Sequence, residues 1–159
     1  MARNDPGVNI TLSVLDRLTD SDPSARTDPV IPWAQSFRET KAAVRRDLEW
    51  LLNTRQSPEP AADDLALASK SVFNFGLPDI TSLTLQSAND RARLLRTLET
   101  TITRFEPRIQ DARVYVDNVV PGSRTLRFRI DGLLRIDPAP ERVSFDTVLE
   151  LSSGQYEVK

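Results

Sequence analysis

A proline at position 107 divides this chain into two parts with different hydrophobic periods. Before it, apolar residues recur every three to four positions, as they do on one face of a helix: Leu95, Leu98, Ile102 and Phe105. Ser87 is a suitable N-cap, with Asp90 as a weaker capping-box partner, and we predict a helix from Ser87 to Phe105. Pro107 lacks an N–H and disfavours the α region for Glu106, so the helix must end there.

After Pro107 the apolar period changes from 3.6 to 2, which is typical of strands with one buried face. The alternation runs through three stretches: Val114 and Val116; Leu126, Phe128 and Ile130; and Val143, Phe145, Thr147, Leu149 and Leu151. Turns are expected at 121–123 and 138–140, where proline and glycine are found. The sequence therefore predicts a single α+β domain, with N-terminal helices packed on a small C-terminal antiparallel meander.

The N-terminal region contains little that could form a core. Residues 1–9 show no apolar pattern, and we expect a mobile tail there, followed by one folded domain over 10–159. Apolar residues within 10–18 indicate a brief helix. The segment 19–35 is expected to be mainly an extended linker, because Asp-Pro and Ile-Pro pairs disfavour helix.

A longer helix is predicted from Ser36 to Thr54. Ser36 and Glu39 have the spacing of a capping box. The apolar stripe of this helix is expected to comprise Val44, Leu48, Leu51 and Leu52. Farther along, a helical turn is expected at 64–69, and Gly76 suits a turn that requires a positive φ.

The composition excludes several kinds of chemistry. The chain has neither cysteine nor histidine, so it can form no disulfide, no thiolate or imidazole metal site and no serine-histidine-aspartate triad. Its 21 basic and 23 acidic residues give a net charge of −2, which argues against a general nucleic-acid binder. No apolar run approaches the length of a membrane span, and no signal-peptide pattern opens the chain. We therefore expect a cytoplasmic protein without cofactors.

Glu106 occupies an unfavourable position. It lies at the negative end of the predicted helix dipole, which disfavours a carboxylate by up to about 1 kcal/mol. A carboxylate placed there needs a partner. One interpretation is a local ion pair with Arg104 or Arg108, worth about 0–1 kcal/mol at a surface. The other is a contact with a second protein.

The helix over 36–54 has a second face that could bind a partner. This far side carries Arg46, Glu49, Trp50 and Asn53. Charged side chains are expected on a solvated face, whereas a large aromatic there often marks a contact surface. Trp50 could equally pack under the linker before this helix, and the sequence alone does not decide between the two.

Arginines form a stripe on the polar face of one predicted strand, at Arg127, Arg129 and Arg135. The stripe could meet an acidic partner. It could also serve only to discourage edge-to-edge pairing of sheets, and this second interpretation is favoured.

A glycosidase would need two carboxylates flanking the scissile bond, and Glu49 and Glu106 are candidates. Because the chain has 23 acidic residues, many such pairs exist, and sequence cannot supply their separation. A peptidoglycan-cleaving muramidase is therefore the alternative function. Purified protein incubated with peptidoglycan tests it.

Four motifs occur in order along the chain. They are 13–18 (SVLDRL), 46–55 (RDLEWLLNTR), 71–79 (SVFNFGLPD) and 105–108 (FEPR). Together they closely resemble the TssE baseplate subunits of bacterial type VI secretion systems, which belong to the lysozyme-like baseplate wedge family of contractile phage tails. The resemblance covers about residues 10–151.

The resemblance implies a structural, non-enzymatic subunit with helices packed on a small antiparallel sheet. It implies wedge partners (TssF, TssG and TssK) and sheath partners (TssB and TssC), and a cytoplasmic place at a baseplate docked on the inner membrane of a Gram-negative bacterium. It also places Glu106, Pro107 and Arg108 at the contact between baseplate and sheath, where that contact would help start sheath polymerisation. Strand addition at a sheet edge or a charge-assisted pair could provide the contact. A small regulatory adaptor on the same fold is a third possibility.

Overall fold

The computed structural model describes residues 14–19, 24, 33–62, 64–80, 87–117, 125–137, 139–150 and 153–159. The predicted tail over 1–9, most of the linker and the 121–123 turn lie outside the described residues. The elements are α1 (Val14–Leu18), α2 (Trp33–Asn53), the 3-10 turn η1 (Val72–Asn74), α3 (Ala88–Phe105), β1 (Ile109–Val116), β2 (Thr125–Leu134), β3 (Glu141–Glu150) and β4 (Gln155–Val158). The α+β prediction is confirmed.

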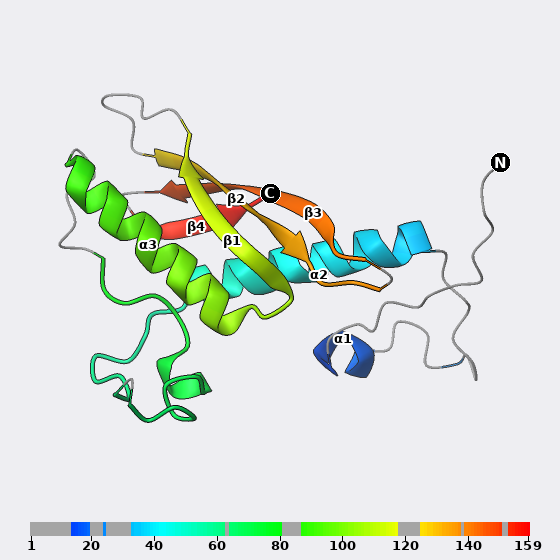
Figure 1. The fold of residues 1–159 in the computed structure, drawn as a ribbon, viewed down its shortest axis with the longest axis horizontal. Helices are drawn as coiled ribbons and strands as arrows, with labels where there is room; N and C mark the ends of the chain where they lie inside the picture. The colour runs from blue at the N-terminus through cyan, green and yellow to red at the C-terminus, as the bar shows by residue number, and fades with distance from the viewer. Residues whose placement is uncertain are drawn as a thin grey trace.

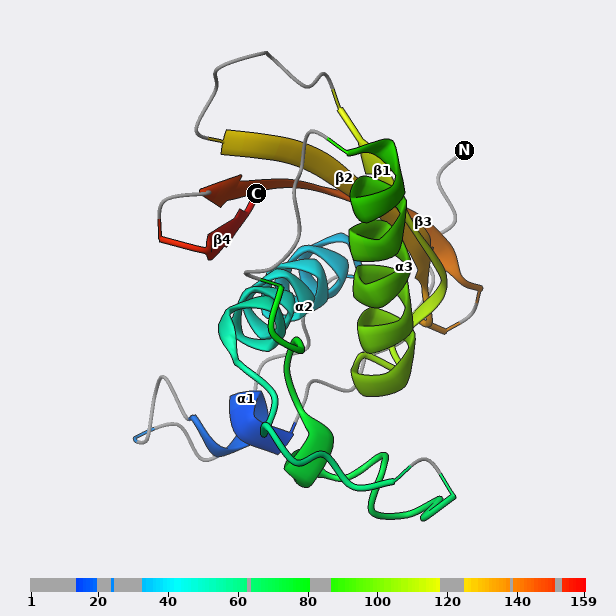
Figure 2. The ribbon, with the colours of Figure 1, turned by 90° about the vertical axis from the view of Figure 1, so that its left-hand side faces the viewer.

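The four strands form one antiparallel sheet in the order β1-β2-β3-β4, and α2 and α3 lie against one of its faces (Figures 1 and 2). Helix α3 packs along β1 and α2 packs against β4. The short helix α1 lies on the side of α2 that faces away from the sheet. The core fills the space between helices and sheet, and its fully buried side chains include Val44, Leu48, Leu98, Ile102, Phe128, Ile130, Leu134 and Phe145.

Helix α3 matches its prediction. Ser87 is the N-cap, and its hydroxyl accepts a hydrogen bond from the Asp90 N–H at 3.3 Å. The helix ends at Phe105, with Glu106 as C-cap at φ −119° and ψ 76°. This non-helical conformation is what the steric effect of a following proline requires.

Helix α2 differs from its prediction at its start. It begins at Trp33, three residues before the predicted cap, so the linker cannot extend to residue 35. Ser36 is buried within the helix and is therefore not its N-cap, and Glu39 accepts a hydrogen bond from Gln35 at 2.9 Å. The first turn is stabilised instead by a stack of Trp33 on Phe37, with ring centroids 5.5 Å apart. Residues four apart share a helix face, and this aromatic pair extends the helix.

The buried stripe of α2 is the predicted one. Val44, Leu48, Leu51 and Leu52 are each at most 2% exposed. The strands also alternate as expected, and β2 and β3 pair over ten residues from Thr125–Glu150 to Leu134–Glu141. Strand β4, however, is not part of the sequence prediction. It is only four residues long and pairs with the end of β3.

Gly76 occupies the turn expected of it. Its φ is +107°, and a Cβ at this position would collide with the Thr54 carbonyl oxygen. This close approach lets Leu77 donate to the Thr54 carbonyl and Gln56 donate to the Leu77 carbonyl, both at 2.8 Å. The segment that follows α2 is thereby clamped to residues 76–78. Residues 64–69 contain the predicted helical turn, closed by a hydrogen bond from the Ser69 N–H to the Leu65 carbonyl at 2.8 Å, and they form no longer helix.

No helix among the described residues is both long enough and apolar enough to cross a bilayer.

Candidate functional site

The Glu106-Pro107-Arg108 turn connects α3 to β1 and is held by backbone hydrogen bonds on both sides. The Glu106 N–H donates to Ile102 at 2.8 Å, which completes the last turn of the helix. The Ile109 N–H donates back to the Glu106 carbonyl at 3.1 Å. At the end of β2, Arg135 donates its N–H to the Arg108 carbonyl at 2.8 Å. The turn is therefore fixed to both secondary-structure layers.

Glu106 is buried, and its local partner is Arg108. One carboxylate oxygen, Oε1, accepts from the Arg108 Nε at 2.7 Å and from the Arg108 N–H at 3.2 Å, and Oε2 accepts from Nη2 at 2.5 Å. The Glu106 side chain is 6% exposed and that of Arg108 is 28% exposed. The predicted local pair with Arg108 is confirmed, but it is bidentate and desolvated, unlike a weak surface pair.

This pair belongs to a chain of five charges that links three helices. Arg108 also donates to Asp47 Oδ2 at 2.6 Å, and Arg46 donates to Asp47 Oδ1 at 2.8 Å. The other end of the Arg46 guanidinium donates to Asp16 of α1 at 2.7 Å. These five side chains, Asp16, Arg46, Asp47, Glu106 and Arg108, are called the charge chain below. It contains three carboxylates and two guanidinium groups.

The hydrogen bonds of the charge chain hold both arginines in their charged form. Those from Arg108 to Glu106, and secondarily to Asp47, raise the pKa of the Arg108 guanidinium, although burial opposes the shift. Hydrogen bonds to Asp16 and Asp47 raise the pKa of Arg46. Sequence reasoning missed Asp16 and Asp47 as members of the site. Asp47 adjoins Arg46 and could have been considered, but Arg108 lies 61 residues away and only the fold shows the contact.

An apolar hollow of about 430 Å³ opens beside the turn. Its walls come from α1, α2, the residue after η1 and the end of α3, and they include Leu15, Trp50, Leu51, Phe75 and Phe105. The rings of Phe75 and Phe105 meet edge to face at 5.5 Å, which fixes that wall. A second hollow, of about 480 Å³, lies where the turn meets the end of β2. The exposed Pro107 and the half-buried Arg108 line both hollows.

Trp50 is 53% exposed and lies at the rim of the apolar hollow. The Arg46 guanidinium stacks over its ring at 5.0 Å from the centroid, a cation–π contact that holds the indole in place. Any packing of Trp50 under the linker falls outside the described residues. Leu15 of α1 lines the same hollow and is half exposed. The structure thus brings Arg46 and Trp50 together with the Glu106-Pro107-Arg108 turn.

Glu49 and Asn53 of the same helix face have different surroundings. The Asn53 amide accepts from the Tyr156 N–H and donates to the Tyr156 carbonyl, both at 2.8 Å. Glu49 accepts from the Val158 N–H at 3.3 Å. These side chains therefore bind the outer edge of β4. They occupy backbone groups that an added strand would need.

The other sheet edge, β1, is also partly occupied. Glu99 of α3 accepts the Val114 N–H at 2.9 Å. The pairing of β1 with β2 is interrupted by a bulge between Gln110 and Arg113, and Asp111 within it has a φ of +51°. Bulges twist an edge away from regular pairing. Both described sheet edges therefore have backbone groups that are no longer available for strand addition.

The predicted arginine stripe lies on the open face of the sheet. Arg127 and Arg129 belong to β2, and Arg135 follows its last residue. All three are exposed, and Arg129 pairs with Asp131 at 3.5 Å. Arg129 also faces Asp146 across the strands. Opposite charges on neighbouring strands support the sheet itself. Strand β2 lies inside the sheet and not at an edge, so the favoured interpretation, a guard against edge-to-edge pairing, is wrong for Arg127 and Arg129.

The two carboxylates of the muramidase alternative are both engaged within the protein. Glu106 is bound by Arg108 and Glu49 by the β4 backbone. A general acid of a glycosidase needs a carboxyl group that can give a proton to the leaving oxygen, and the bidentate arginine occupies both oxygens of Glu106. Among the described residues, no cluster of three or more acidic side chains could hold a metal ion.

Residues 38–139, more than half of the chain, match the model of the family described as baseplate wedge protein gp25. The chain belongs to this baseplate wedge family. The match extends from the first turns of α2 to the β2–β3 connection and includes the Glu-Pro-Arg turn. Four of the five residues of the charge chain lie inside the wedge-family region, and Asp16 precedes it.

One solved structure similar to this wedge-family chain is described as "The baseplate complex from the type VI secretion system". The two chains are 20% identical with a TM-score of 0.47, and the match covers 70% of this chain and 94% of the other. The comparison with curated proteins finds no match.

Proposed function

We propose that this wedge-family chain is the TssE subunit of a type VI secretion baseplate. In this role it associates with the wedge subunits TssF, TssG and TssK, anchors the sheath of TssB and TssC, and helps the sheath begin to polymerise. Membership in the baseplate wedge family supports a structural role. The four in-order motifs, which resemble those of TssE subunits, support the type VI assignment. The baseplate-bound, cytoplasmic location belongs to the same proposal.

The observation that carries the sheath contact is the division of the Glu-Pro-Arg turn into a buried and an exposed part. Glu106 is almost inaccessible, so it cannot itself form much of an interface. It positions Arg108, whose guanidinium is partly exposed at the rim of the apolar hollow. Pro107, Arg108 and the hollow wall with Trp50 are the surface available to the sheath. An apolar pocket beside a fixed arginine has the composition of an interface hot spot.

Trp50→Ala tests this surface without removing a member of the charge chain. The matched control is Tyr115→Ala, because Tyr115 is 51% exposed, similar to the 53% of Trp50, and belongs to β1. We expect Trp50→Ala to reduce the number of fluorescent sheaths in cells severely and Tyr115→Ala to leave it unchanged. Arg108→Ala should also prevent sheath formation. Circular dichroism of each purified variant identifies any loss of fold.

Two results would contradict the proposed contact. Normal sheath numbers in both folded Trp50→Ala and folded Arg108→Ala would remove its support. Loss of TssF and TssG from the purified wedge in Trp50→Ala would assign the surface to the wedge instead of the sheath.

For the muramidase alternative, glycan release from peptidoglycan that disappears in Glu49→Gln or Glu106→Gln would overturn the proposed non-enzymatic role.

A further inference from the structure

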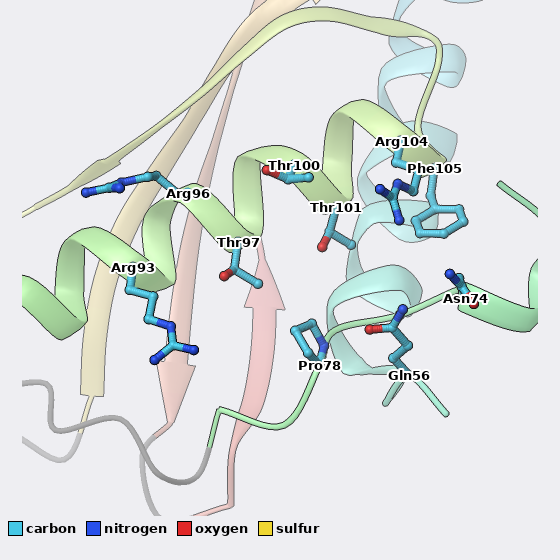
Figure 3. A pocket seen from close by; sticks show the side chains of 11 residues that line it. Gln56, Asn74, Pro78, Arg93, Arg96, Thr97, Thr100, Thr101, Arg104 and Phe105 are labelled. Atoms are coloured by element: carbon cyan, nitrogen blue, oxygen red, sulfur yellow. The ribbon is translucent and has the colours of Figure 1, made fainter. Parts of the chain in front are cut away.

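A third hollow, on the flank of α3, differs in chemistry from the two hollows beside the Glu-Pro-Arg turn. It has a volume of about 300 Å³ and lies between α3 and the clamped segments around Gln56 and Gly76 (Figure 3). In Figure 3, Arg93, Thr97 and Thr101 point from α3 to the side on which Pro78 and Gln56 lie, and these two residues belong to the two clamped segments. This hollow, with lining residues Gln56, Asn74, Gly76, Pro78, Arg93, Arg96, Thr97, Thr100, Thr101, Arg104 and Phe105, is called the α3 cleft below.

The α3 cleft is strongly one-sided in charge. It is lined by three arginines and no carboxylate, in a chain whose net charge is −2. Arg93 and Arg96 are exposed, and neither forms an ion pair with a carboxylate in the described part of the chain. The nearby Asp79 is just outside the cleft and pairs with Arg55 at 3.4 Å. The guanidinium groups of Arg93 and Arg96 therefore favour an acidic ligand.

The wall opposite α3 is held by hydrogen bonds and does not depend on a ligand for its shape. The Asn74 side chain accepts from the Ala61 N–H at 2.7 Å and donates to the Ala61 carbonyl at 3.0 Å. Asn74 is 1% exposed. The Leu77–Thr54 and Gln56–Leu77 hydrogen bonds fix the neighbouring residues. Such preorganisation lowers the entropic cost of binding.

The dimensions of the α3 cleft suit an extended peptide. Its lining runs along α3 from Arg93 to Arg104, which at 1.5 Å per residue is about 16 Å. An extended chain covers this length with about five residues. Three threonine hydroxyls lie between the arginines and can donate to peptide carbonyls. The α3 cleft therefore offers guanidinium groups to the acidic side chains of a peptide and hydroxyl groups to its backbone carbonyls.

We propose that the α3 cleft binds a short, extended, acidic segment of a partner protein. Arg93 and Arg96 bind its carboxylates, and the threonines bind its backbone. Single-stranded nucleic acid fits less well, because it needs aromatic faces for base stacking, and Phe105, the one aromatic in the lining, already meets Phe75 edge to face. The inference does not depend on the sheath contact, since its arginines and threonines lie outside the apolar hollow and its ligand is different.

The test measures binding of a fluorescein-labelled peptide of about eight residues, alternating glutamate and serine, by fluorescence anisotropy. The full-length chain is compared with Arg93→Ala/Arg96→Ala. The matched control is Arg38→Ala/Arg45→Ala, which removes two exposed arginines from α2 and changes the net charge equally. We expect the α3 variant to bind the peptide at least fivefold more weakly and the α2 variant to bind as the unchanged protein does. Binding should weaken as salt is raised.

Several outcomes would overturn the inference. Undetectable binding to the unchanged protein, or equal losses in the two double variants, would show that the α3 cleft has no special affinity. Displacement of the peptide by inorganic phosphate, with both supplied at the same total concentration of negative charge, would indicate a site for small anions. Tighter binding of a thymidine oligonucleotide, lost in Arg93→Ala/Arg96→Ala, would indicate a nucleic-acid site. None of these results bears on sheath formation.

Discussion

Replacement of Glu106 by alanine should destabilise the fold, although the residue lies at a surface turn. The change removes three hydrogen-bond contacts to Arg108 and leaves that guanidinium facing the vacated space. Arg108 keeps its 2.6 Å contact to Asp47, and its side chain is 28% exposed, so water can reach it in part. The variant therefore loses part of a buried ion pair and does not leave a fully isolated charge.

The magnitude follows from these contacts. Removing one partner of a fully buried pair costs about 3–5 kcal/mol. The remaining Asp47 partner and the partial exposure reduce this cost, and we expect the free energy of unfolding to fall by about 2–4 kcal/mol. For a domain of this size, a loss of about 3 kcal/mol lowers the melting temperature by about 6–12 °C.

Urea denaturation followed by circular dichroism measures the change. Glu157→Ala is the control, because the Glu157 side chain is 63% exposed and pairs with Lys159 at 3.4 Å. If the free energy of unfolding changed by less than about 0.5 kcal/mol in Glu106→Ala, as it should in the control, the reasoning would be refuted. The Glu106–Arg108 pair would then contribute no more than a weak surface ion pair. The Glu106→Ala/Arg108→Ala double variant completes the cycle and should be less destabilised than the sum of its single changes.

Three further changes have expected outcomes. Leu48→Ala should lower the free energy of unfolding by about 2–5 kcal/mol in a urea titration, because Leu48 is fully buried on α2, and a near-zero change would contradict its core position. Asn53→Ala should increase amide hydrogen exchange at Tyr156 in β4, with exchange in β2 unaffected; unchanged protection at Tyr156 would show that β4 is held by its pairing with β3 alone. Burial raises the pKa of the Tyr156 hydroxyl, whose oxygen has no hydrogen-bond partner among the described residues. As the pH rises, the unfolded chain therefore releases this proton before the folded protein does, and the free energy of unfolding should fall above about pH 10. Tyr156→Phe should reduce that fall. It should also raise the free energy of unfolding at neutral pH by about 1 kcal/mol.

The parts of the fold that the sequence predicts correctly are those with a sustained period or a steric rule. Helix α3 has a cap, a stripe and a proline stop, and its bounds agree with the structure. The start of α2 is wrong because the stacked Trp33 and Phe37 outweigh the Ser36 signal. Strand β4 is too short to show a period, and its order depends on pairing with β3 and on Asn53.

The candidate site likewise has contacts that local sequence reasoning finds and contacts that only the fold shows. The Glu106–Arg108 pair is two residues apart, so local reasoning finds it. Asp47 joins the pair only through the packing of α2 against the end of α3, which sequence spacing does not show. A helical wheel places Glu49 and Asn53 on the face away from the core, and it cannot show that the last strand of the sheet passes close to that face.

The hydrogen bonds that Asn53, Glu49 and Glu99 make with the outer strands have a consequence for self-assembly. An edge strand whose backbone groups already form hydrogen bonds is a poor template for strand pairing with a second copy of the chain. The protein can then accumulate before assembly without forming continuous sheets through these positions. On the proposed role, this is what a subunit at the start of a polymer requires: it directs the growth of other proteins in one direction, and its own copies do not add to one another.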